Sequence, residues 1–394
     1  MSKGAYIGVG GTAQKVKKGY FGVDGVARKV KKAYLGVDGV ARPCWSGGGK
    51  LAYYGTITPL SQARYGLEAI AIGSYALALG GYSSNVVDAF DPALTRSTPT
   101  VLSVARDAFG TASVGDYALA MGGRGKSSAL NTIDAYDSAL TRTTPTTLSQ
   151  VRQFVSGVSV GNYALAVGGA SGTSSSSVYY ANIEVFDAAL TRSSMAELSV
   201  GRRNITCAVV GNYALAMGGR DSYSIKGAVD AYDATLTRST PMALSIARMN
   251  MGAATVGNYA LAMGGSKGTN DGEFLSTVDA YDTALTRTMP MELSRVRELL
   301  AGTSLEDYAL AMGGQYSTEP AAKLAVVDVY DSTLTLSVQT SLSQSRSRLA
   351  GVTVGNYALA MGGSPPPPSY APIESAVVDA YTPVSYTHLT LPTN

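Results

Sequence analysis

The chain has 394 residues and a net charge of +3, with 45% hydrophobic residues, 15% charged residues and 45 glycines. No apolar run approaches the roughly 20 residues that span a bilayer, so we expect no membrane insertion. The two cysteines, Cys44 and Cys207, stand outside any metal or redox spacing, and we predict no disulfide framework, no metal site and no cofactor.

Charge is unevenly distributed along the chain. Residues 1–50 hold ten Lys/Arg against Asp24 and Asp38, giving +8, while the remainder holds 21 basic and 26 acidic residues, giving −5. A basic segment therefore precedes a mildly acidic body. We expect these two parts to have different partners.

Residues 1–46 form a basic repeat with a period of 14 residues. Tyr6-Ile-Gly-Val, Tyr20-Phe-Gly-Val and Tyr34-Leu-Gly-Val are each followed by a Gly-Gly or Asp-Gly dipeptide. Such dipeptides between β-forming residues predict hairpins, here three in a row. Because small hairpins bury little surface, we expect this arm to dock on a larger body.

The Lys-rich repeats resemble those at the start of predicted phage and prophage tail proteins. This resemblance covers about 40 residues and implies an assembly or tail protein as partner and a virion-associated location. Met1 to Gly11 lacks the apolar stretch of a signal peptide, so we expect synthesis in the cytoplasm. Two alternatives stay open: binding of nucleic acid or another anionic polymer, which is less favoured, and hairpins that only solubilise the chain.

Seven copies of the phrase Tyr-Ala-Leu-Ala-x-Gly-Gly dominate the rest of the sequence. Successive Gly pairs lie 42 to 50 residues apart, a period typical of propeller blades or solenoid units. The pairs are at residues 80/81, 122/123, 168/169, 218/219, 264/265, 313/314 and 362/363.

Each repeat reads as four short strands, as the unit from Leu244 to Pro290 illustrates. An LSxxR motif and a run of small residues come first, Gly257-Asn258 marks a turn, and two further segments follow the Gly-Gly pair. The segments are short and alternate with period two, which predicts strands rather than helices. Small side chains in the first strand suit a position near the axis of a ring.

The second strand of a repeat has one bulky face and one small face. In the same unit, Tyr259, Leu261 and Met263 alternate with Ala260 and Ala262. The bulky face of one blade can therefore fill the shallow face of its neighbour at all seven interfaces. We expect the Gly pair to be structural, required by a positive φ or by close approach of a neighbour.

The repeats resemble the kelch motif in their Gly-Gly pair, variable loop, Val-x-x-Tyr-Asp strand and following Arg. The resemblance covers residues 51–382 and implies a seven-bladed kelch-like β-propeller. With the N-terminal β-hairpin repeat arm, the expected fold class is all-β. Kelch repeats usually carry a Trp after that Tyr, but the only Trp of this chain is Trp45. We expect Leu140, Leu236 and Leu285 to pack in its place.

The last repeat lacks its fourth strand, and residues 51–60 look like an unassigned strand ahead of the first repeat. We therefore expect this N-terminal strand to complete the seventh blade of a propeller domain spanning residues 47–383. Residues 384–394 fit no repeat and look like translated sequencing-adapter sequence, so we exclude them as a non-native tail. The only histidine, His388, belongs to that tail.

The sequence offers little catalytic chemistry. No histidine remains for a metal or a general base, and no HExxH or phosphate-loop motif occurs. Seven carboxylates recur at one repeat position and are expected to form a ring: Asp88, Asp134, Glu184, Asp230, Asp279, Asp328 and Asp379. Glu68, near the predicted axis, is the one acid out of pattern. We predict that the protein is not an enzyme, with a glycan-acting propeller enzyme as the alternative.

The candidate ligand-binding residues are arginines and loop aromatics. The arginine of LSxxR recurs at 64, 106, 152, 202, 248, 297 and 346, and the kelch resemblance implies that it lies beneath the variable loops. Guanidinium groups suit carboxylates, phosphates and sulfates, but each Arg can equally pair with the repeated acid as a structural element. The full candidate set is Arg64, Arg106, Arg152, Arg202, Arg248, Arg297, Arg346, Tyr82, Tyr179, Tyr180, Tyr223, Phe274 and Tyr316, with Tyr370 in the last loop.

A uniform frame that carries unequal, Tyr- and Ser-rich loops is typical of a recognition protein. We therefore predict a non-catalytic module whose loop face binds a surface glycan or a protein, while the arm docks to a larger assembly such as a phage tail. A structural virion or scaffold protein without a ligand is the second alternative.

Overall fold

The computed structural model describes residues 51–383 except 174–175, 269–272, 320–321 and 368–372, together with the backbone of six strands between residues 6 and 46. Tyr370, the tail at 384–394 and the Asp-Gly turns of the arm lie outside the described residues. Throughout the described part, the regular structure is β and no helix occurs, so no helix there could cross a membrane. A compact unit spans Tyr53–Tyr381.

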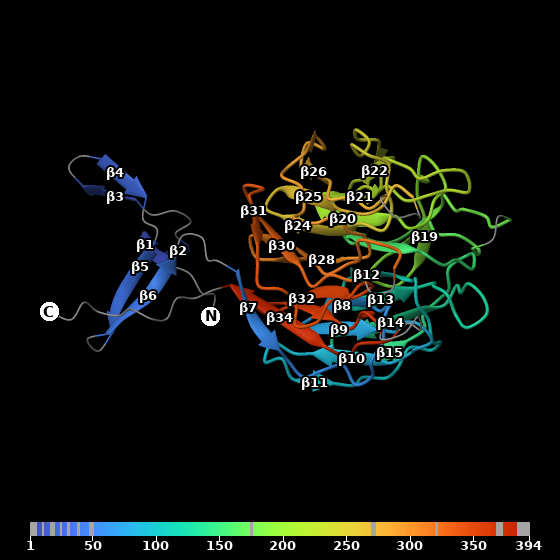
Figure 1. The fold of residues 1–394 in the computed structure, drawn as a ribbon, viewed down its shortest axis with the longest axis horizontal. Coiled ribbons are helices and arrows are strands. Elements are labelled where there is room, and N and C mark those ends of the chain that lie inside the picture. The colour runs from blue at the N-terminus through green and yellow to red at the C-terminus, as the bar shows by residue number, and fades with distance from the viewer. Residues whose placement is uncertain are drawn as a thin grey trace. The chain divides into compact units, whose positions relative to one another are not determined.

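Seven four-stranded antiparallel sheets form the compact unit and confirm the seven-bladed β-propeller (Figure 1). Each sheet runs outward from a first strand next to the axis, in sequence order in six of the seven blades. The first three blades are β8 (Glu68–Ile72), β9 (Tyr75–Leu79), β10 (Val87–Phe90), β11 (Arg96–Ser97); β12 (Gly110–Val114), β13 (Tyr117–Met121), β14 (Ile133–Asp137), β15 (Arg142–Thr143); and β16 (Ser156–Val160), β17 (Tyr163–Val167), β18 (Ile183–Phe186), β19 (Arg192–Ser194).

The remaining blades repeat this plan and close the ring. They are β20 (Thr206–Val210), β21 (Tyr213–Met217), β22 (Val229–Tyr232), β23 (Arg238–Ser239); β24 (Gly252–Val256), β25 (Tyr259–Met263), β26 (Val278–Asp282), β27 (Arg287–Thr288); β28 (Ala301–Leu305), β29 (Tyr308–Met312), β30 (Val327–Asp331), β31 (Leu336–Val338); and β32 (Ala350–Val354), β33 (Tyr357–Met361), β34 (Val378–Pro383), β7 (Leu51–Thr56).

The outer strand of the seventh blade comes from the N-terminal side of the chain. β7 pairs with β34, and the two lie side by side in Figure 1. The hydroxyl of Tyr53 on β7 donates to Asp379 on β34 at 2.7 Å, and the Tyr53 and Tyr381 rings are 5.3 Å apart. The strand expected over residues 51–60 thus ends at Thr56, and it covers an edge that would otherwise be open.

Large and small faces meet between blades as the sequence pattern predicts. Leu261 and Met263 of the fifth blade pack against Ala309 and Ala311 of the sixth, with the buried Tyr330 completing the cluster. The same arrangement recurs at other blade interfaces. The core is therefore a ring of equivalent interfaces rather than one central cluster.

The second strand of each blade ends in glycines because the next blade comes too close for a side chain. Gly264 has φ +63, and a Cβ on it would lie 2.5 Å from the carbonyl oxygen of Arg297 in the next blade. Its neighbour Gly265 has φ +102 and donates its N–H to that same oxygen at 2.9 Å. The Gly pair is thus a backbone connection between blades.

Three leucines that the sequence predicts to pack between blades lie in the turn before the fourth strand of their blade. Leu140, Leu236 and Leu285 pack against the blade-interface clusters. All three adopt φ between 62° and 64°, a region that a branched side chain rarely enters. In the last of these turns, the carboxylate of Asp282 accepts the backbone N–H groups of Ala284 and Thr286, which holds the turn in place.

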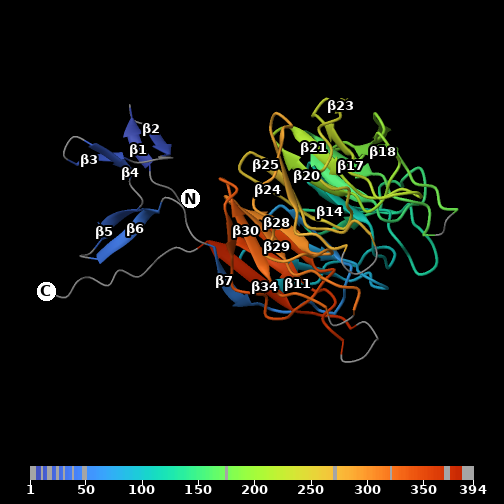
Figure 2. The same cartoon turned by 45° about the horizontal axis from the view of Figure 1, so that its top comes forward.

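The N-terminal arm contains three two-stranded antiparallel pairs. They are β1 (Tyr6–Val9) with β2 (Thr12–Lys15), β3 (Tyr20–Val23) with β4 (Val26–Lys29), and β5 (Lys32–Val37) with β6 (Val40–Ser46). Figure 2 shows each pair. The third pair is longer and its register shifts between Ala33 and Tyr34. The 14-residue period thus corresponds to one hairpin per repeat.

Candidate binding site at the channel mouth

The seven arginines of the LSxxR motifs are buried inside the blades. Each side chain has 0% exposure and forms an ion pair with the repeated acid on the third strand of its own blade. The pairs are Arg64–Asp88, Arg106–Asp134, Arg152–Glu184, Arg202–Asp230, Arg248–Asp279, Arg297–Asp328 and Arg346–Asp379.

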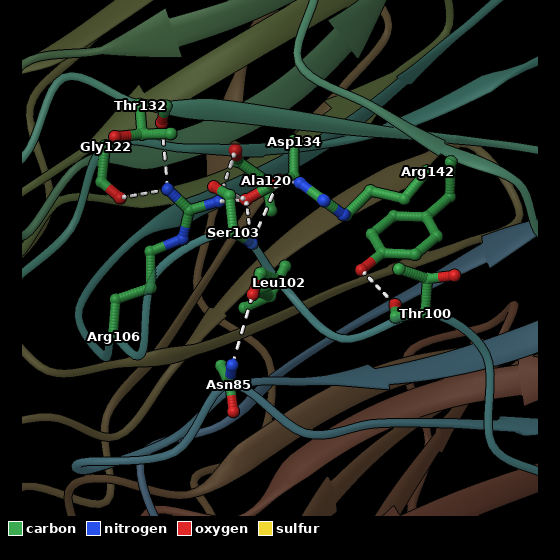
Figure 3. Close-up of polar contacts among 11 residues, drawn as sticks. Asn85, Thr100, Leu102, Ser103, Arg106, Ala120, Gly122, Thr132, Asp134 and Arg142 are labelled. Atoms are coloured by element: carbon green, nitrogen blue, oxygen red, sulfur yellow. Dashed lines mark hydrogen bonds and ion pairs between the residues drawn. The ribbon is translucent and has the colours of Figure 1, made fainter.

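The second blade shows how such a pair is held (Figure 3). Arg106 contacts Asp134 and donates to the carbonyl oxygens of Thr132 at 2.9 Å and Gly122 at 3.3 Å. Asp134 also accepts from the Ser103 hydroxyl at 3.0 Å and from Arg142 at 2.8 Å. Burial lowers the pKa of Arg106, and the charge of Asp134 opposes that shift. This geometry favours the structural alternative for the arginine ring.

The segment after each buried arginine lies beside the loop that follows Gly-Gly. The backbone of Asp107 pairs with that of Arg124 in an isolated β-bridge, and Glu298 pairs with Gln315 in the same way. Equivalent pairs recur in other blades. Both connections therefore emerge on one face of the propeller, which we call the loop face. This is the face on which the variable loops were predicted.

A cavity of about 580 Å³ opens at the centre of the loop face. The innermost strands line it, and their small residues allow close approach: a Cβ on Gly302 would lie 2.0 Å from the carbonyl oxygen of Ala253. Seven residues at positive φ, each two positions after a buried arginine, surround its mouth: Gly66, Ala108, Phe154, Asn204, Asn250, Leu299 and Arg348.

The mouth is the part of the ring where the repeats disagree. The residue directly after each buried arginine also differs in every blade: Tyr65, Asp107, Gln153, Arg203, Met249, Glu298 and Ser347. Sequence reasoning missed these fourteen positions because it followed what the repeats share. The sequence feature that could have identified them is their variation from repeat to repeat, between the recurring arginine and the recurring first strand.

A continuous series of cations and aromatic rings follows the mouth from the seventh blade to the fourth. Adjacent members lie 5.0 to 6.0 Å apart, measured from ring centres to guanidinium carbons or between ring centres. In order, the members are Arg348, Tyr65, Tyr82, Arg124, Phe154, Arg203 and Tyr179. Distances of this size are within the range of cation–π attraction.

The cations of this series differ in their partners. Arg124 forms a two-point contact with Asp107, at 2.9 and 2.5 Å. Arg203 donates to the carbonyl oxygen of Gly172 at 2.9 Å, and its Nε is buried without a hydrogen-bond partner in the described part of the chain. No carboxylate among the described residues forms an ion pair with Arg203 or Arg348.

The mouth over the fifth and sixth blades carries an acid and amides instead. Glu298 accepts from Asn250 at 2.8 Å, Ser266 at 2.7 Å and Gln315 at 3.1 Å. Three donors satisfy this carboxylate, so its position is fixed. The mouth is therefore asymmetric, cationic and aromatic on one side and acidic and amide-rich on the other.

Glu68 lies on the first inner strand and lines the cavity. Burial, followed by the charge of Asp107, raises the pKa of Glu68 to about 8. The side chain is half-buried, and a carboxyl group with a raised pKa keeps its proton to a higher pH than an ordinary glutamate.

The predicted loop aromatics divide into separate environments. Tyr82 and Tyr179 belong to the mouth series, whereas Tyr180 lies 5.7 Å over the buried Arg152. Phe274 is buried with 6% exposure and offers no surface. Tyr223 and Tyr316 are exposed on separate loops.

Comparison with known proteins supports the fold. No protein-family model matches the sequence, and no curated protein matches it. Among solved structures, YjhT is similar with a TM-score of 0.59 and 12% identity, covering 72% of this chain and 99% of that chain. At this identity the similarity shows a shared propeller fold.

Proposed function

We propose that the protein is a non-catalytic recognition module that binds a surface glycan or a protein at the mouth of its central channel. The observation that carries this proposal is the variation between blades at the two positions after each buried arginine, nine of which line the cavity. Blade packing imposes the same demand seven times, so this variation between blades points to a role other than packing. A concave cavity of about 580 Å³ with convergent polar groups suits a ligand.

A binding screen tests the proposal. The full chain is applied to a glycan array and to intact bacterial cells, alongside a mouth variant, Phe154→Ala, and a control, Met242→Ala, on an exposed side chain remote from the mouth. We expect binding that the mouth variant weakens at least tenfold and the control leaves unchanged. If neither the wild-type protein nor the variants bind any glycan or cell surface, a structural scaffold without a ligand is favoured.

The arm is proposed to dock the module to a larger assembly such as a phage tail. Its excess of basic residues against a mildly acidic propeller supports separate partners. Deletion of residues 1–45 should abolish incorporation into the assembly and leave ligand binding intact. Loss of both, with the propeller still folded, would contradict two separable functions.

Glu68 supports a second candidate, an enzyme that acts on a glycan. A carboxyl group with a pKa near neutrality in a central cavity is a feature of general acids. Any glycan found in the screen is therefore incubated with the protein and with Glu68→Gln. Turnover that the variant loses would replace the recognition module by this enzyme.

A further inference from the structure

Two cations lie near each other at the mouth, over the sixth and seventh blades. Lys323 is in the loop that follows the sixth Gly-Gly pair, and its Nζ donates to the Gln315 side chain at 2.6 Å. Arg348 lies two residues after the buried Arg346, at the mouth of the cavity. Ser347, the neighbour of Arg348 in the chain, donates to the same Gln315 oxygen at 3.2 Å. Burial, followed by the charge of Arg348, lowers the pKa of Lys323, and the charge of Glu298 opposes that shift.

Neither cation forms an ion pair with a described residue. The contrast with Arg124, which is paired with Asp107, shows that the mouth can supply a carboxylate where a cation needs one. Two neighbouring positive charges without one repel each other and lower the stability of the folded protein. An arrangement with this cost calls for an anion from outside the chain.

Local backbone preference also opposes an arginine at position 348. The residue has φ 53°, a region that favours Gly and Asn. Three other blades place Gly or Asn there, and the remaining three place Ala108, Phe154 and Leu299. Packing between blades gives no reason for a long cation here, because Arg348 is exposed. We therefore look for the role of the Arg348 side chain in binding at the mouth and not in packing between blades.

The surrounding contacts orient both cations while leaving donors free. The centre of the Tyr65 ring lies 5.8 Å from the Arg348 guanidinium carbon, and no described residue accepts a hydrogen bond from that guanidinium group. Gln315 accepts from Lys323 and, at 3.2 Å, from the Ser347 hydroxyl, and donates to Glu298 at 3.1 Å. Such preorganisation lowers the entropy lost on binding.

We infer that Arg348 and Lys323 bind an oxyanion, a carboxylate, sulfate or phosphate group carried by the ligand of the channel mouth. Arg348 contributes a planar edge that matches two oxygens, and Lys323 contributes a point charge. The polar side of the mouth, with Glu298 and Asn250, then faces the uncharged part of the same ligand. This inference rests on the proposed recognition function and assigns the chemical class of what is recognised.

Small anions with a neutral isostere test the inference on the full chain. Acetate, methyl phosphate and methyl sulfate are each titrated at constant ionic strength, and acetamide serves as the uncharged match for acetate. Binding is read by NMR at the backbone amide of Ser347, which every variant retains. We expect saturable shifts with dissociation constants of about 1–10 mM for at least one anion and no saturation with acetamide. The strongest of the three identifies the source of the oxyanion.

Variants locate the site. We expect Arg348→Ala to abolish saturation, Arg348→Lys to weaken binding about tenfold through loss of the two-point contact, and Lys323→Met to weaken it about threefold to tenfold. Lys126→Ala removes one exposed positive charge from a second-blade loop, outside the cavity lining, and should change nothing. Unfolding midpoints within error of the wild type establish that each variant folds.

Saturation that survives Arg348→Ala, equal binding of acetamide and acetate, or no saturable binding of any anion would each overturn the inference. These outcomes leave the recognition proposal standing as long as the surface screen finds a binder that depends on Phe154. Conversely, a screen without any binder removes the recognition proposal even where the small anions bind. The two failures are thus distinguishable.

Discussion

Removal of one buried arginine tests whether the arginine ring is structural. Arg248 and Asp279 are both fully buried, 2.7 Å apart, and Arg248 also donates to the carbonyl oxygens of Ala262 and Ile246 at 3.1 Å. The variant Arg248→Met leaves the buried carboxylate of Asp279 without its closest cation. Among the described residues, Ser245 still donates to this carboxylate, and Arg287 lies 3.6 Å from it. Losing one partner of a buried pair costs about 3–5 kcal/mol.

Urea unfolding followed by fluorescence or circular dichroism measures this cost. We expect Arg248→Met to lower the free energy of unfolding by about 4 kcal/mol, and the double variant Arg248→Met/Asp279→Asn to recover part of that loss because no unpaired charge remains. Arg287→Ala is the control: its partly exposed side chain lies 3.6 Å from the same carboxylate, so we expect a cost of about 1 kcal/mol or less. If Arg248→Met costs no more than the control, or loses ligand binding while keeping full stability, the structural interpretation of the ring is refuted.

Three further predictions concern the frame and the cavity. Gly264→Ala should lower the unfolding free energy by about 3 kcal/mol, because a Cβ meets a neighbouring carbonyl oxygen at 2.5 Å; Gly227→Ala, with its nearest contact at 3.5 Å, is the near-neutral control in the same urea assay. Tyr53→Phe removes the 2.7 Å hydrogen bond to Asp379 and should cost about 1–2 kcal/mol; no change in urea midpoint would show that ring closure does not depend on it. For Glu68, the folded pKa of about 8 exceeds the ordinary value of 4.5, so the folded state holds the proton longer. The wild type should lose stability relative to Glu68→Gln as pH rises from about 5 to 8; a pH-independent difference contradicts the raised pKa.

The frame of the molecule is predictable from sequence because each of its rules is repeated seven times. The alternation of Leu261 and Met263 with small residues predicts the packing between blades, and Gly264 predicts the close approach. From the sequence, each LSxxR arginine was expected either to bind a ligand or to pair with the recurring acid of its repeat. The length of β7 was overestimated, because Pro59 and Leu60 continue a β-like pattern after the strand has ended at Thr56.

The candidate site was harder to predict for a physical reason. A residue that recurs in all seven blades has the same surroundings seven times, and in a closed ring those surroundings are the blade interior, where Arg248 lies. Phe154 and Arg203 follow recurring arginines by two residues and one residue, yet they come together only when the third and fourth blades pack side by side. Their contacts join different blades, so no single repeat contains the pattern.

A propeller with identical blades would present a symmetric mouth, and a ligand without that symmetry would bind it in several equivalent orientations. In this protein the residues at the mouth differ between blades, so the orientations are not equivalent. Arg348 and Lys323 place unpaired positive charge over the seventh and sixth blades, and Arg203 places it over the fourth, while Glu298 holds a negative charge among amides between them. Under the proposed recognition function, an anionic ligand would find a few unequal positions around the mouth instead of seven equivalent ones, which the repeated frame alone cannot supply. The frame provides rigidity, and the unlike residues at its mouth provide direction.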